Sequence, residues 1–113
     1  MGAARTKPAG SGPGGREPLA PLIHGRVRLI ILSHLVRAGR PLGFIEAREA
    51  LGLTDGTLSA NLTKLEEGGL VQIVKGFEGR RPKTLVRVTP EGRRRFRLYV
   101  EDLKTIVPGL DSP

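Results

Sequence analysis

Small and polar side chains line one face of a helix expected to begin at the N-cap Thr54 and to end at Gly68 or Gly69. Leu58, Leu62 and Leu65 recur at i, i+4 and i+7 and therefore share the opposite, inward face. The outward set is Thr54, Gly56, Thr57, Ser59, Ala60, Asn61, Thr63 and Lys64. Such groups can approach the major groove of duplex DNA and hydrogen-bond base edges or phosphates. An ordinary solvated helix surface is the alternative interpretation.

A second set of chemically suggestive residues is basic and follows this helix. Lys75, Arg80, Arg81 and Lys83 are opposed only by Glu78 within the same short segment. The flanking segments 70–75 and 84–88 are rich in Val and Ile, which predicts a hairpin with residues 76–83 as its loop. These cations could neutralise DNA phosphates, and Arg80 or Arg81 could enter a narrow minor groove. The alternative interpretation of this segment is a solvated basic turn.

Two earlier helices are expected to position the polar helix. The first should run from Pro21 to Ala38 and end at Gly39, and the second should occupy residues 43–51 and end at Gly52. The first helix should bury Ile23, Val27, Ile30, Ile31 and Leu35, and the second Phe44, Ile45, Ala47, Ala50 and Leu51. A short turn leads to Thr54, which is a good N-cap. This arrangement predicts a helix-turn-helix.

A last helix is predicted from Thr89 as N-cap and Pro90 as first helical residue, ending before Pro108. Its apolar stripe and a second apolar stripe on the first helix predict a homodimer interface. That interface comprises Leu22, Leu29, Leu32, Val36, Tyr99, Leu103, Ile106 and Val107. The stripes could instead pack within one chain. Arg93, Arg94, Arg95 and Arg97 form a basic patch, for which phosphate contact and solvation both remain open.

Composition limits the possible classes of protein. The 113 residues fit one domain, and 19 Lys and Arg against 11 Asp and Glu give a formal charge of +8, which favours polyanionic partners. The chain has no cysteine and no apolar run long enough for a membrane span, so a cytoplasmic location is expected. Residues 1–18 and 109–113 are predicted to be flexible tails around a domain at residues 19–108.

No enzymatic arrangement is evident. His24 and His34 are the only histidines and project in different directions from one helix, which disfavours a shared metal site. The acidic pairs Glu46/Glu49 and Glu66/Glu67 lack the apolar surroundings that would raise a carboxyl pKa. We therefore expect no catalytic residue, no metal and no cofactor.

Four segments, in order, resemble the small winged-helix transcriptional regulators related to the MarR and ArsR groups. They are Pro21 to His24, Leu51 to Glu67, Phe77 to Thr84 and Thr89 to Gly92. The resemblance covers residues 19 to about 100. It implies a mostly helical α+β winged helix-turn-helix with three helices, a two-stranded wing and a C-terminal helix. Gly43 and Ala47 depart from the pattern, where a hydroxyl cap and a larger apolar residue are usual.

The resemblance further implies a dimeric, sequence-specific protein that binds double-stranded DNA. Residues 54–65 would be the recognition helix and residues 76–83 the wing. A dimer would place its recognition helices about 34 Å apart on an inverted repeat. No effector ligand is implied. Two alternatives are a protein-interaction module, which should show aromatic or Met anchors on the outward helix face, and a non-specific architectural DNA-binding protein, for which only Phe77 could act as a wedge.

Overall fold

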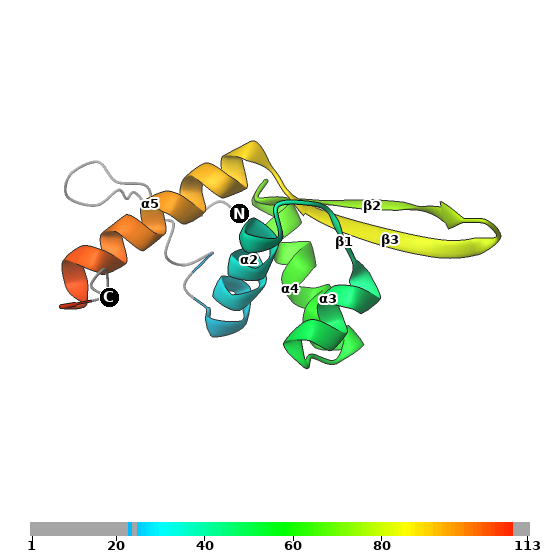
Figure 1. The fold of residues 1–113 in the computed structure, drawn as a ribbon, viewed down its shortest axis with the longest axis horizontal. Helices are drawn as coiled ribbons and strands as arrows, with labels where there is room; N and C mark the ends of the chain where they lie inside the picture. Colours follow the sequence, from blue (N-terminus) through cyan, green and yellow to red (C-terminus); the bar gives the residue numbers. More distant parts are fainter. Residues whose placement is uncertain (1–22, 24, 110–113) are drawn as a thin grey trace, which may run out of the picture.

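The computed structural model describes residue 23 and residues 25–109. The elements are α2 (Arg26–Ala38), β1 (Leu42–Gly43), α3 (Phe44–Leu51), α4 (Asp55–Glu67), β2 (Val71–Glu78), β3 (Arg81–Val88) and α5 (Pro90–Ile106). The helices α2, α3 and α4 gather into one body, from which the β2–β3 hairpin and α5 project in different directions (Figure 1). This is the mostly helical α+β winged helix that the sequence predicts. The predicted tail at residues 1–18 lies outside the described residues, as do residues 110–113 of the predicted tail at 109–113.

Helix boundaries after residue 50 agree with the predicted caps. The Thr54 hydroxyl accepts a 3.1 Å hydrogen bond from the Thr57 amide at the start of α4. The Thr89 hydroxyl accepts a 2.8 Å bond from the Gly92 amide at the start of α5. Gly52 ends α3 with φ 66°, a left-handed conformation that glycine adopts without steric cost.

The two earlier helices differ from their predictions. Gly25 has ψ 134° and serves as the N-cap of α2, so one continuous helix from Pro21 is wrong. Ile30 is 39% exposed and Ile45 61% exposed, although both were expected to be buried, and Ala50 is exposed too. Gly43 provides no hydroxyl cap for α3, but its amide donates a 3.2 Å hydrogen bond to Glu46 Oε1.

The sheet has a third strand that the sequence did not reveal. Its order is β1-β3-β2, all antiparallel, and β1 pairs through Leu42 with Val86. A two-residue strand carries no alternation that could be recognised. The hairpin strands are also longer than predicted, because pairing continues to Glu78 and Arg81. The expected eight-residue loop 76–83 is therefore wrong, and only residues 79 and 80 form the turn.

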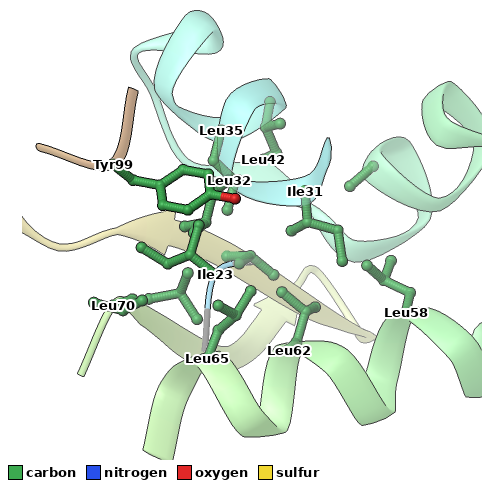
Figure 2. Close-up of a cluster of buried hydrophobic side chains, with 13 residues drawn as sticks. Ile23, Ile31, Leu32, Leu35, Leu42, Leu58, Leu62, Leu65, Leu70 and Tyr99 are labelled. Carbon is green, nitrogen blue, oxygen red and sulfur yellow. The ribbon is translucent and has the colours of Figure 1, made fainter. Parts of the chain in front are cut away.

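Two residues predicted for the homodimer interface lie in the core of one chain instead, so their prediction is wrong. Leu32 is completely buried and Tyr99 is 6% exposed, and both belong to the cluster around Leu58, Leu62 and Leu65. Figure 2 shows the Tyr99 ring pointing from α5 into this cluster. Since α2 contacts both α4 and α5, its two apolar stripes both find partners within the chain. Among the described helices, none has the length and apolar character needed to cross a bilayer.

Candidate nucleic-acid interface

The outward face of α4 is available to a macromolecular partner. Gly56, Ser59, Ala60, Thr63 and Lys64 are all exposed, while the three leucines of the same helix are buried. A Cβ at Gly56 would meet no atom within 4 Å. The face is thus open, free of bulky side chains and polar, as entry into a major groove requires.

Three predicted contact residues already have intramolecular roles. Thr54 Oγ1 donates a 2.9 Å hydrogen bond to Thr57 Oγ1 while capping the helix. Asn61 Nδ2 donates to the Thr57 carbonyl at 2.8 Å, and Arg28 Nη1 donates to Asn61 Oδ1 at 3.2 Å. The Arg28 contact joins α2 to α4 across 33 positions, a separation at which sequence periodicity carries no signal. Arg28 is therefore a positioning residue that sequence reasoning missed.

A groove of about 530 Å³ separates α4 from the hairpin. Ser59 and Thr63 line it from α4, and Lys75 lines it from β2. Glu66 also lines it, and its Oε2 accepts a 3.0 Å hydrogen bond from the Ile73 amide at the free edge of β2. Tertiary folding therefore brings one wing cation beside the polar face of α4.

The other wing cations lie elsewhere on the hairpin. Residues directly opposite in an antiparallel pair share one face of the sheet, so Lys75 lies on the face of Thr84, and Lys83 on that of Gly76. By the same alternation Arg81 shares the face of Lys83, and Arg80 is in the turn. Lys83 Nζ lies 3.5 Å from Glu78 Oε1. The four cations therefore form a distributed charge around the hairpin rather than one cluster.

A second hollow, of about 390 Å³, lies where the start of α3 meets the outer half of β3. Arg81 and Lys83 line it together with Ile45 and Glu46. Arg40 Nη2 donates to Glu46 Oε2 at 2.6 Å, and this bond lowers the pKa of the Glu46 carboxyl. Glu46 is thus held as a carboxylate at the start of α3, where the helix dipole favours negative charge.

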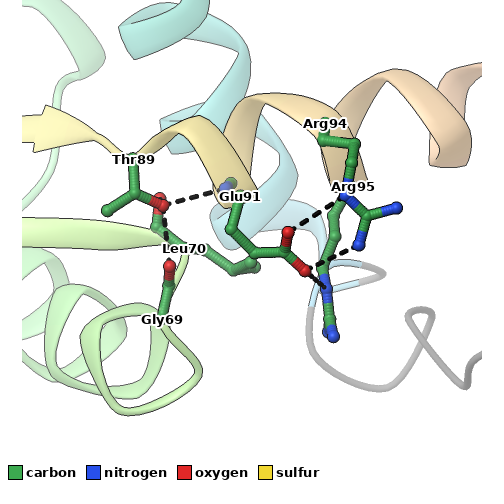
Figure 3. A network of polar contacts seen from close by, with 7 residues as sticks. Gly69, Leu70, Thr89, Glu91, Arg94 and Arg95 are labelled. Carbon is green, nitrogen blue, oxygen red and sulfur yellow. Dashed lines mark hydrogen bonds and ion pairs between the residues drawn. The ribbon is translucent and has the colours of Figure 1, made fainter.

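A polar junction attaches α5 to the end of α4. Thr89 Oγ1 donates to the Gly69 carbonyl at 2.7 Å, and the Thr89 amide donates to the Leu70 carbonyl at 3.0 Å. Figure 3 shows this junction beside Glu91, whose carboxylate accepts hydrogen bonds from Arg94 and Arg95. These guanidinium groups lower the pKa of Glu91 to about 2. The junction fixes α5 relative to α4.

Within residues 23 and 25–109, no three His, Cys, Asp or Glu side chains come close enough together to hold a metal ion. The exposed hydroxyl and cationic side chains of α4 and the hairpin can form hydrogen bonds and neutralise negative charge. A capped helix-turn-helix of α3 and α4, with a basic hairpin beside it, defines a winged helix-turn-helix protein.

Comparison with known proteins extends this assignment from architecture to family. Residues 27–107 match the family described as the winged helix DNA-binding domain. The match covers most of the chain, which belongs to that family.

Solved structures share the fold. A transcriptional regulator homologue from Pyrococcus horikoshii OT3 is 32% identical, with a TM-score of 0.75, and the match covers 81% of this chain and 90% of that one. A protein from Enterococcus faecalis V583 assigned to the MarR family of transcriptional regulators is 25% identical, with a TM-score of 0.66 and 74% coverage of both chains. The predicted resemblance to MarR-type winged-helix regulators is confirmed.

A curated relative without a described activity also matches. An uncharacterized protein of Methanocaldococcus jannaschii is 41% identical over 56 residues, which is 50% of this chain and 61% of that protein. The chain thus matches less than two thirds of that relative.

Proposed function

We propose that this protein is a transcriptional regulator that binds specific sequences of double-stranded DNA through α4 and the β2–β3 hairpin. The observation that carries the proposal is the open polar face of α4 bordering a groove that Lys75 lines from the wing. The family and the regulator homologue from Pyrococcus horikoshii support the same conclusion.

The chemistry of α4 suits a major groove about 12 Å wide. Gly56 and Ala60 allow close approach, and Ser59, Thr63 and Lys64 supply donors and acceptors to base edges and phosphates. Asn61 and Arg28 hold the helix in place, so we assign Asn61 to positioning as well as to the interface.

The hairpin would contact the DNA backbone beside the groove. Lys75 would contact a phosphate next to α4, and Arg80 at the turn would enter the adjacent minor groove. Among the described residues, neither cation has an ion-pair partner, so no internal contact must be broken for either to bind phosphate.

A homodimer is the proposed assembly, with α5 at its interface. Ile106 is 70% exposed and Val107 42% exposed near the end of this projecting helix, so both would be covered in a dimer (Figure 1). Leu29, Val36 and Leu103 are only partly buried and can contribute at the margin, while Leu22 lies outside the described residues. A two-fold dimer of this kind would bind an inverted repeat.

The direct test is selection of bound sequences from a random duplex pool at about 150 mM salt, where contacts to phosphate alone are weakened. We expect enrichment of an inverted repeat, and loss of that enrichment in the Ser59→Glu/Thr63→Glu variant. Retention of DNA without a motif would instead indicate architectural binding. Absence of retention would contradict DNA binding and favour a protein partner.

The wing has its own test. Lys75→Ala should reduce the slope of log affinity against log salt by about 0.9 if Lys75 contacts one phosphate. Arg37→Ala is the matched control, since Arg37 is an exposed cation in the last turn of α2. An equal change of slope in both variants would show that Lys75 acts only through net charge.

A further inference from the structure

We propose that a cluster of arginines at the start of α5 forms a second surface for the phosphate backbone of duplex DNA, separate from the α4 face. We call it the arginine hollow, and Arg87, Arg93, Arg94 and Arg97 line it. The inference goes beyond the proposed function, because binding through α4 alone does not require it.

The hollow has a volume of about 440 Å³ and no acidic residue lines it. Its cations come from two elements, since Arg87 lies near the end of β3 and the other three lie in the first half of α5. The first residues of α5 line the hollow too, so the positive end of the helix dipole adds to the charge. Four guanidinium groups around one open hollow create a strongly anion-attracting surface.

The arginines are only partly compensated by the protein. Arg87 Nε donates to the neutral Gln72 Oε1 at 2.7 Å, and Arg94 is paired with Glu91. Arg93 and Arg97, at i and i+4, have no carboxylate partner within the part of the chain that the structure describes. Like charges at this spacing oppose folding, and Arg93 also lies near the positive end of the helix dipole. Stability therefore does not explain them, whereas a bound polyanion would.

The arginine hollow and α4 lie on opposite faces of the sheet. Arg87 shares a face with Gln72, whereas its neighbours Val86 and Val88 point to the other face, where Val86 joins the core with the leucines of α4. A straight duplex docked on α4 cannot reach both faces. The DNA at the arginine hollow must be a different duplex, or the same duplex sharply bent.

The character of the hollow favours DNA over an acidic protein segment. Arginine forks match phosphate oxygens in bidentate geometry. The lining contains no aromatic or Met side chain that could anchor a protein partner. A regulator with such a surface would hold a second DNA segment near its binding site.

The test is a capture experiment with the full-length chain. Protein is loaded on an immobilised duplex of about 20 base pairs, too short to bend around the protein, and capture of a second, labelled duplex is measured. We expect capture by the wild type and at least about tenfold less capture by Arg93→Glu/Arg97→Glu, from lost phosphate contacts. Arg26→Glu/Arg37→Glu is the charge-matched control, on exposed positions of α2, and should retain capture.

Folding of the double variant can be checked independently. The double variant exchanges one pair of like charges at i and i+4 for another, so its thermal unfolding should stay close to that of the wild type. Equal capture by this variant and the wild type would overturn the inference, as would equal loss in the control.

Two further arms separate the remaining outcomes. On a duplex of about 60 base pairs with labelled ends, bending of the flanking DNA onto the hollow would bring the two ends closer together. If the wild type brings the ends together and Arg93→Glu/Arg97→Glu does not, the hollow binds bent flanking DNA. If Ser59→Glu/Thr63→Glu binds the immobilised duplex like the wild type, the proposed role of α4 fails. If Arg93→Glu/Arg97→Glu alone matches the wild type in second-duplex capture, only the arginine hollow fails.

Discussion

Replacement of Gly92 by alanine should destabilise the protein, although alanine is the better helix former. Gly92 lies in the first turn of α5, against the backbone of Leu70. A Cβ at this position would lie 2.0 Å from the Leu70 carbonyl oxygen and 2.8 Å from its carbon. Both obstructing atoms belong to the backbone, so no side-chain rotation can relieve the overlap.

The magnitude follows from two opposing effects. Helix propensity favours alanine by up to about 1 kcal/mol. The overlap must open from 2.0 Å to about 3.4 Å, which would stretch the Thr89 hydrogen bonds to Gly69 and Leu70. Overpacking of this kind costs about 1–3 kcal/mol, and lost hydrogen bonds add about 1 kcal/mol each. We therefore expect a net loss of about 2–3 kcal/mol, or roughly 10–20 °C in melting temperature for a domain of this size.

Thermal and urea unfolding monitored by circular dichroism would measure the change. Gly56→Ala is the matched control, because Gly56 lies in the first turn of α4 and a Cβ there meets nothing within 4 Å. That variant should be neutral or stabilised. A Gly92→Ala protein as stable as the wild type would refute the close packing of α5 on Leu70.

Two further predictions concern caps and charge. Thr54→Ala should cost about 1 kcal/mol of unfolding free energy, because the Thr57 amide loses its acceptor, while Thr63→Ala at an exposed helical site should cost little; urea titration would separate the two. Glu91 has a folded pKa of about 2 against an ordinary 4.5, so its contribution to stability is present above pH 4.5 and is lost as the pH falls through 2. Glu91→Gln should therefore be less stable than the wild type at neutral pH, and melting curves should converge toward pH 2. A stability difference independent of pH would exclude the ion pairs with Arg94 and Arg95 as its cause.

Local chemistry made much of the fold predictable. Thr54, Thr89 and Gly52 act within one helical turn, where a hydroxyl meets an amide three residues away or a glycine adopts positive φ. The inward face of α4 could also be predicted from local spacing, because leucines at i, i+4 and i+7 must share one face of a helix. The polar face of α4 and the basic hairpin were therefore evident from the sequence.

Long-range packing decided the rest of the site. The groove between α4 and Lys75 and the Arg28–Asn61 contact join segments that lie far apart in the chain, whereas the arginine hollow is lined from residues 87–97 and depends on how the end of β3 meets the start of α5. The hairpin length was also missed, because Gly76 and Pro82 are typical of loops, yet the outer half of β3 pairs only with β2 and tolerates a proline.

Sequence alone thus determined the order of elements, the caps and the inward face of α4, because these features depend on neighbours within a turn or a strand. It also showed the resemblance of the chain to winged-helix regulators. Only the tertiary structure decided what covers each apolar stripe of α2. Leu32 and Tyr99 looked like interface residues, but α5 packs against α2, and both residues are buried in the core of one chain. Periodicity can identify an apolar face, but which partner covers that face depends on how distant segments pack.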